Sequence, residues 1–154
     1  MPADRTVDAV ERMRLALYAV GILLIIQPLG DLVANVWPPH FTTVEWRYGV
    51  MGLLSGFTLT PMLGLVMILA VAAIVHDQAV LKVVGWLGII AGAFLIIMTV
   101  FFALEIIQFR VRVPVENRGQ YDIGSWKSVA KHLTAGPVLI MLGRAGLRAG
   151  RPGG

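Results

Sequence analysis

The fold of this chain is decided by residues 83–109, VVGWLGIIAGAFLIIMTVFFALEIIQF, in which the single ionisable side chain is Glu105. A helix that crosses the hydrocarbon core of a bilayer needs about 20 consecutive, mostly apolar residues. This stretch is longer than that, and its only charge lies near its end. It therefore predicts a helix that spans a membrane.

Two other stretches, residues 15–37 and 48–75, are long and apolar enough to span in the same way. A fourth, residues 129–147, has a shorter uncharged centre, which also suits a re-entrant or interfacial segment. Its charges lie toward its ends, where long side chains reach the headgroups. We therefore expect an all-α membrane protein, a bundle of four transmembrane helices that forms one integral membrane domain over residues 1–154.

The composition of the whole chain agrees with this expectation. It has 154 residues, of which 57% are hydrophobic and 14% charged, and its mean hydropathy is +0.78. A soluble domain of this size buries only about 70% of its surface and cannot hide so much apolar material. The composition therefore excludes a water-soluble enzyme, a disordered tail and a nucleic-acid-binding module. The lack of cysteine excludes thiol catalysis and cysteine-based zinc sites.

The segment before the first span, residues 4–13, has apolar Val7, Val10 and Met13 at helical spacing and acids in its first turn. This pattern predicts a short amphipathic helix that lies on the membrane surface and continues into the first span. Because no small-residue cleavage site follows the apolar run, we expect the first span to be retained.

The connections between the spans differ in length. Pro38 and Pro39 end the first span, and residues 76–82 form a tight turn that makes the second and third spans an antiparallel hairpin. The third connection, residues 110–127, is long and polar, with turns expected at 117–119 and 122–124.

The net charge of +4 comes from Lys and Arg residues that flank the apolar segments. We attribute it to orientation and to contact with anionic lipid, not to a nucleic acid. Arg5, Arg12 and Arg14 precede the first span and Arg47 follows it, which favours a cytoplasmic N-terminus in the inner membrane of a bacterium. If residues 129–147 did not span, the charge count would favour the opposite orientation.

Small residues at helical spacing predict where the helices pack. Gly30 and Ala34 on the first span, and Gly52 and Gly56 on the second, lie at similar depth if these spans are antiparallel. We expect a close crossing there. Gly85, Gly88 and Gly92 form a second stripe, on the third span. We expect it to lie beside Ala70 and Ala73 of the second span.

Prolines lie near the middle of three predicted spans, at Pro28, Pro61 and Pro137. Each removes a backbone donor and frees a carbonyl group. We expect bends that shape the packing, because nearby Ser and Thr hydroxyls satisfy the freed groups. In a transporter the same bends would serve as hinges.

Several polar side chains fall toward one face of the membrane, the face that carries the first and third connections. An ionised group within a bilayer costs about 2.5 to 3.5 kcal/mol, so each of them should be paired or face the interior. They form either a protonatable vestibule or an ion-pair lock that closes one end of the bundle. We favour the lock, because a conduction path needs polar groups along its full length. The cluster comprises Asp31, Arg47, Glu105, Gln108, Lys131 and His132.

The histidines do not predict a metal or haem site, because His76 lies on the opposite face from His40 and His132. The spacing of Ala72 and His76 is similar to the one with which light-harvesting polypeptides ligate bacteriochlorophyll, which would make His76 a pigment ligand. We expect His76 to be a helix-end residue at the interface. The sequence requires no cofactor, although contacts with lipid or pigment are compatible with it.

No complete catalytic set is present, so we do not expect an enzyme. The leading hypothesis is an accessory or scaffolding subunit of a larger bacterial inner-membrane complex, for example a photosynthetic or respiratory one, held by helix contacts. Its partners would be membrane lipids and other membrane protein subunits, not nucleic acid. The alternative is a small proton-coupled transporter or channel that uses Asp31, Glu105 and His132.

Overall fold

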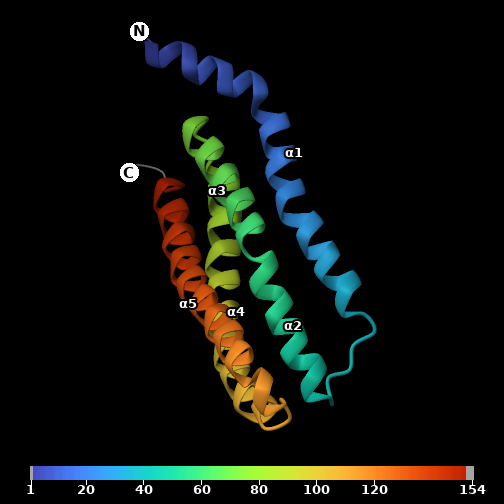
Figure 1. Cartoon of the computed structure of the whole chain (residues 1–154). Helices are drawn as coiled ribbons and strands as arrows, with labels where there is room; N and C mark the ends of the chain where they lie inside the picture. The colour runs from blue at the N-terminus through green and yellow to red at the C-terminus, as the bar shows by residue number, and fades with distance from the viewer. Residues whose placement is uncertain (1, 152–154) are drawn as a thin grey trace.

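A computed structural model describes residues 2–151 of the chain, with side chains from Asp8 onward. Throughout this range the regular structure is helical, and the long helices run roughly side by side (Figure 1). The expected all-α fold is therefore confirmed. The elements are α1 (Pro2–Val36), α2 (Val44–Phe57), α3 (Leu59–Ile74), α4 (Gln78–Arg110), the short 3-10 helix η1 (Val115–Asn117) and α5 (Arg118–Ala149).

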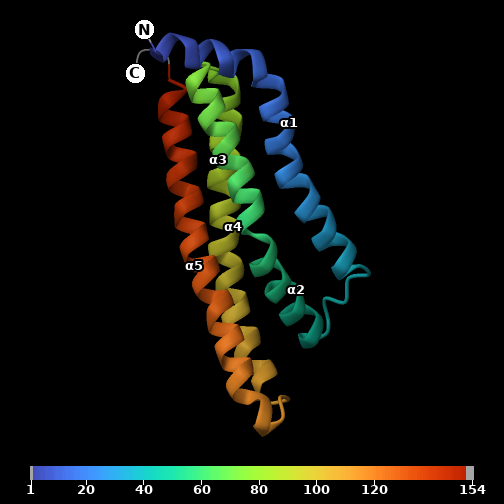
Figure 2. The same cartoon turned by 45° about the horizontal axis from the view of Figure 1, so that its top comes forward.

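Helix α1 contains both the predicted surface helix and the first span. Its first turns run across the end of the bundle at which α3 and α5 end, and the rest turns to run beside α3 (Figure 2). In the crossing part, Arg14 pairs with Glu11 at 3.2 Å. The predicted role of the Val7 side chain, and the chain end at 152–154, lie outside what the structure describes.

Two or three helices are long and apolar enough to cross a membrane. Residues 8–36 of α1 and the whole of α4 meet this requirement, and α2 and α3 meet it together if the bent pair is one span. Helix α5 is not among them, so the four-span bundle expected above is established only in its coarser form, as a helical protein with two or three candidate spans.

The predicted second span is not one straight helix. Helices α2 and α3 meet at Thr58 with a bend of 43°. Pro61 has no N–H to bond to the carbonyl group of Phe57, and its ring crowds that turn. The Thr58 hydroxyl donates to the Leu54 carbonyl at 2.6 Å and so satisfies a group beside the break. Pro28 and Pro137, in contrast, lie inside continuous helices.

The third connection is shorter than predicted, and both predicted turns within it are wrong. Residues 119 and 122–124 are helical, because α5 begins at Arg118 instead of residue 129. An ion pair between Asp122 and Arg110, at 2.8 Å, ties the early turns of α5 to the end of α4. This tertiary contact outweighs the turn preference of Gly119 and Gly124.

The core lies where α3, α4 and α5 meet, and α1 packs on the far side of α3. Many large apolar side chains point outward; Ile107 is 68% exposed and Met141 is 70% exposed. Such a surface is unfavourable in water and suits contact with acyl chains. The core cluster comprises Leu65, Ile68, Leu69, Ala72, Leu81, Val84, Leu95, Ala135 and Leu139.

Candidate functional site

The polar end of the bundle is organised by an ion pair between Arg47 of α2 and Glu105 of α4. The Nε and Nη2 groups of Arg47 donate to the two carboxylate oxygens of Glu105, at 2.6 and 3.2 Å. Its Nη1 group donates to the carbonyl oxygen of Phe41, at 2.6 Å. The Glu105 side chain is only 14% exposed. Two parallel, charge-assisted hydrogen bonds hold the guanidinium and carboxylate groups in one relative orientation. This pair therefore ties α2 and the first connection to α4.

The other members of the predicted polar cluster do not join this pair. Asp31, Gln108 and Lys131 are exposed on α1, α4 and α5. His132 is fully buried, and neither of its ring nitrogens has a hydrogen-bond partner within the described chain. Its ring meets the edge of Phe102, with centroids 6.3 Å apart. The structure thus separates the cluster into one closed ion pair, one buried histidine and three exposed groups.

An aromatic layer that sequence reasoning missed lies at the same end of the bundle as the ion pair. Tyr48 of α2 stacks against Phe102 and Phe109 of α4 and Tyr121 of α5, with centroids 4.9 to 5.4 Å apart. Its hydroxyl shares a hydrogen bond of 2.8 Å with that of Ser125. The spacing of Phe102 and Phe109, two helical turns, was a usable signal, since it puts both rings on one face.

Further bonds close the same layer. The Tyr121 hydroxyl donates to the carbonyl oxygen of Ile106 at 2.8 Å, and burial raises the pKa of Tyr121 to about 12. The hydroxyls of Ser55 and Ser128 lie 3.0 Å apart and join α2 to α5. These bonds join α2, α4 and α5 at this end of the bundle.

Two exposed ion pairs lie at the same end. Arg110 donates two bonds to the carboxylate of Asp122, at 2.8 and 2.9 Å, and these bonds hold the pKa of Asp122 below its usual value. Arg112 pairs with Glu45, which links the third connection to α2. The charges at this end are therefore largely neutralised by each other.

The glycine stripe of α4 packs against a different helix from the one predicted. A Cβ at Gly92 would lie 2.5 Å from the carbonyl oxygen of Gly136, and one at Gly85 would lie 2.9 Å from that of Gly143. Gly88 also faces α5. The stripe thus forms the α4/α5 contact instead of meeting Ala70 and Ala73, which are exposed.

The predicted crossing of the first two spans is also in a different place. A Cβ at Gly30, Gly52 or Gly56 would meet nothing within 4 Å. Ala34 is exposed. The close approach is made instead by Gly21 of α1 and Gly64 of α3: a Cβ at Gly64 would lie 2.5 Å from the carbonyl oxygen of Gly21. The bend at Thr58 explains the difference, because it directs α2 away from the line of α3.

His76 occupies the turn between α3 and α4, where its φ is 54°. It is exposed, and Asp77 beside it caps α4 by accepting from the Val80 N–H at 3.2 Å. Ala72 is fully buried, so the small residue of the predicted pigment spacing offers no open face to a macrocycle. The structure thus places His76 at a helix end.

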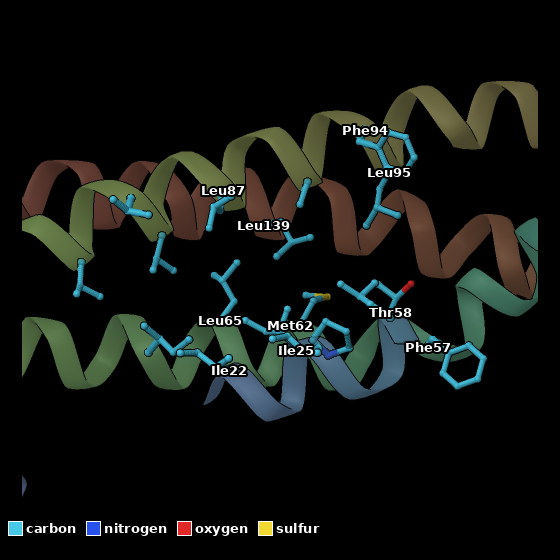
Figure 3. A pocket seen from close by; sticks show the side chains of 18 of the residues that line it. Ile22, Ile25, Phe57, Thr58, Met62, Leu65, Leu87, Phe94, Leu95 and Leu139 are labelled. Carbon is cyan, nitrogen blue, oxygen red and sulfur yellow. The ribbon is translucent and has the colours of Figure 1, made fainter. Parts of the chain in front are cut away.

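An apolar groove of about 720 Å³ lies between α1 and α4, with α3 at its base. Figure 3 shows Leu87 and Leu95 of α4 facing Ile22 and Ile25 of α1 across it, with Leu65 between them. Among the residues that line it, Tyr18 and Thr58 carry the only polar side-chain atoms. This groove was not predicted.

The described residues therefore provide ion pairs and aromatic packing at one end of the bundle, and an apolar groove that can bind an apolar ligand along one side. Among residues 8–151, whose side chains the structure describes, no group of three or more metal-ligating side chains comes together. Comparisons with family models, curated proteins and solved structures found no match to this chain.

Proposed function

We propose that this protein is a non-catalytic accessory subunit of a multi-subunit complex in a bacterial inner membrane, for example a photosynthetic or respiratory one. The observation that carries the proposal is a pair of small-residue stripes that the chain itself leaves open. Gly52 and Gly56 on α2, and Gly30 on α1, have no atom within 4 Å of an added Cβ. In lipid such stripes let helices approach closely, so they suit a helix of another subunit.

Helix α5 enters this proposal as the fourth span. It lies against α4 through Gly85, Gly88 and Gly92, and α4 has 33 residues, or about 50 Å of helix. A neighbour that follows α4 at backbone contact lies at the same membrane depth. Lys131 and Arg144 can extend toward the headgroups, and His132 faces the interior.

The proposed orientation places the N-terminus in the cytoplasm. At the far end Arg47, Arg110 and Arg112 are all neutralised by acids. At the end that carries the two termini, the ion pair among the described residues is Arg14 with Glu11. Exposed cations without an acid partner among the described residues are more numerous at this end than at the far end, where they are Lys127 and Lys131, and an excess of cations favours the cytoplasmic side. At this end they are Arg12, Lys82, Arg144, Arg148 and Arg151.

Purification in a mild detergent tests the subunit role. The full chain, tagged in its native membranes, should migrate as part of a larger complex whose other subunits are identified by mass spectrometry. Gly52→Leu and Gly56→Leu should release those subunits, because the new side chains fill the space that a partner helix needs. Ala70→Leu and Ala73→Leu add the same bulk to an exposed face of α3 and should leave the complex intact.

Each outcome decides the proposal. A wild-type chain that migrates alone with full stability contradicts the subunit role. A complex that survives Gly52→Leu and Gly56→Leu as well as it survives the alanine variants contradicts the proposed interface. Both leucines have room within the chain, so the fold should persist, which circular dichroism checks.

The second candidate, a small proton-coupled transporter or channel, is favoured by the buried and unpartnered His132 and by the break at Thr58. It requires that Asp31 and Glu105 exchange protons. Reconstituted vesicles test it: the Asp31→Asn and Glu105→Gln variants should abolish a measured proton or solute flux. Unaltered flux in both variants would remove this candidate.

A further inference from the structure

The groove between α1 and α4 is a lateral opening in the bundle. Among the described residues α1 contacts α2 and α3 and does not contact α4 or α5. The space left beside it measures about 720 Å³. Figure 3 shows that α1 and α4 form its two sides, that α3 lies at its base, and that Phe57 of α2 and Leu139 of α5 also line it. Any occupant therefore enters sideways, from the bilayer.

The size of the groove identifies the kind of occupant. A volume of 720 Å³ lies within the range of about 300 to 1,000 Å³ that is typical of small-molecule sites. Because the walls are apolar, they suit a molecule with a hydrocarbon chain.

The length of the groove corresponds to one leaflet. Along α1 it extends from Tyr18 to Leu29, or about 16 Å of helix, and it ends beside the break at Thr58. The hydrocarbon core of a bilayer is about 30 Å thick, so one leaflet supplies about 15 Å. An acyl chain that starts at the headgroup region therefore reaches the inner end of the groove.

The outer end of the groove carries the groups that would meet a headgroup. The hydroxyl of Tyr18 is buried and has no hydrogen-bond partner within the described chain. Arg14 lies one helical turn earlier on the same face of α1, and one of its nitrogens contacts Glu11. Asp77 is the acid closest to this hydroxyl: one of its carboxylate oxygens caps α4, and the other is the acceptor that competes with a headgroup for Tyr18.

The charge at this end of the bundle complements an anion. The described cations there outnumber the described acids. The cations are Arg12, Arg14, Lys82, Arg144, Arg148 and Arg151, and the acids are Asp8, Glu11 and Asp77. An anionic headgroup near such a surface is attracted by about 1 kcal/mol per nearby cation.

We propose that the groove holds one anionic phospholipid from the leaflet nearest the N-terminus. An acyl chain lies in the groove alongside residues 18–29 of α1, and the headgroup region accepts hydrogen bonds from Tyr18 and Arg14. The bound lipid fills the gap between α1 and the rest of the bundle. It fixes the position of α1, whose other contacts are with α2 and α3.

Native mass spectrometry of the full chain tests this assignment. The protein is exposed to vesicles that contain equal amounts of phosphatidylglycerol, which is anionic, and phosphatidylethanolamine, which is not. We expect one retained phospholipid per chain, enriched in phosphatidylglycerol. Ala91→Phe fills the groove and should abolish retention, whereas Ala73→Phe, on the exposed face of α3, should not.

Two further variants test the headgroup contacts. Tyr18→Phe should weaken retention about fivefold, which is the effect of one lost hydrogen bond. Arg14→Gln should remove the preference for phosphatidylglycerol. As a second measurement, phosphatidylglycerol should raise the melting temperature of the wild-type protein in a saturable way, and phosphatidylethanolamine should raise it less.

Several results would overturn the proposal. One is equal lipid retention by the Ala91→Phe and Ala73→Phe variants, and another is wild-type protein that retains no lipid and gains no stability from it. A retained mass that corresponds to a quinone would identify a different ligand. Cross-links from a cysteine at position 91 to another protein would show that a partner fills the groove.

Discussion

Gly92 of α4 and Gly136 of α5 bring the backbones of these two helices into contact. A Cβ added at Gly92 would lie 2.5 Å from the carbonyl oxygen of Gly136, and one added at Gly136 would lie 3.1 Å from that of Gly92. Because dispersion forces and close packing hold helices together in lipid, such contacts determine how firmly α5 is attached.

Alanine at Gly92 is therefore expected to destabilise the protein. The added methyl group cannot be accommodated without moving a backbone, and overpacking of this kind typically costs about 1 to 3 kcal/mol. Thermal unfolding of the purified protein in detergent measures the effect. The control is Gly52→Ala, whose Cβ meets nothing within 4 Å and should be neutral or stabilising, since alanine favours helix over glycine. Equal losses in both variants would contradict the contact.

The same glycines show what the sequence could and could not predict. Spacing of three and four residues identifies a face of a helix, so the Gly85 to Gly92 stripe was recognised as a packing surface. It does not identify the neighbour. Both α3 and α5 run antiparallel beside α4, and spacing alone cannot choose between them. The bend near Pro61 was predicted, and so was the compensating threonine hydroxyl beside it, whereas the sequence did not distinguish Pro61 from Pro28 and Pro137, which lie inside continuous helices.

The candidate site was predictable where a single residue in its own stretch of sequence carried the signal. A charged Glu105 in an apolar helix required a partner, and Arg47 belongs to the polar cluster that was predicted with it. The aromatic layer and the start of α5 at Arg118 were not predicted, because both depend on contacts between residues far apart in the chain. The groove was missed because it is formed by the absence of an α1–α4 contact, which no local pattern encodes.

Replacing the buried His132 with leucine should leave the protein as stable or make it more stable by about 1 kcal/mol. Neither ring nitrogen has a partner within the described chain, and a buried unpaired polar group costs about 1 to 3 kcal/mol. Chemical unfolding in detergent measures the change. Leu139→Ala, which removes a large buried side chain, should lose about 2 to 5 kcal/mol and shows that the assay is sensitive.

Severe destabilisation by His132→Leu would give the opposite conclusion. It would mean that the imidazole bonds to a group that the chain itself does not supply, such as an ordered water molecule. That result would strengthen the transporter over the accessory subunit, because a hydrated histidine in the interior can pass a proton.

The ion pair between Arg47 and Glu105 should respond asymmetrically to mutation. Glu105 is only 14% exposed, whereas Arg47 is 32% exposed. Arg47→Gln leaves the more buried charge without a partner, so it should lower the melting temperature more than Glu105→Gln does. The double variant should be more stable than the sum of the two losses predicts. Additive losses would mean that the two side chains do not interact.

An exposed pair provides the comparison for this experiment. Arg112 and Glu45 are joined at the same end of the bundle, but both side chains are about half exposed. Water and salt screen such a pair, and Arg112→Gln should change the melting temperature little. A loss as large as that of Arg47→Gln would show that burial does not set the strength of these pairs.

Stability should fall in acid partly through Asp122. Arg110 holds the pKa of this carboxyl group below its usual value of about 3.9. A group whose pKa is lowered by folding stabilises the native state above its unfolded pKa, and this contribution is lost as the pH falls through the folded pKa. Melting temperatures recorded from pH 6 down to about pH 3 should therefore decline more steeply for wild-type protein than for Asp122→Asn.

The partner residue makes this test specific, because the lowered pKa arises first from the hydrogen bonds that Arg110 donates. Arg110→Gln leaves the carboxyl group in place but removes the cause of its shift, so it should flatten the acid decline as Asp122→Asn does. Both variants should be slightly less stable than wild type at neutral pH and should approach it at low pH. An unchanged acid decline in Arg110→Gln would assign the pH dependence to other carboxylates. It would also mean that the pair of Arg110 and Asp122 does not help to hold the start of α5 to the end of α4.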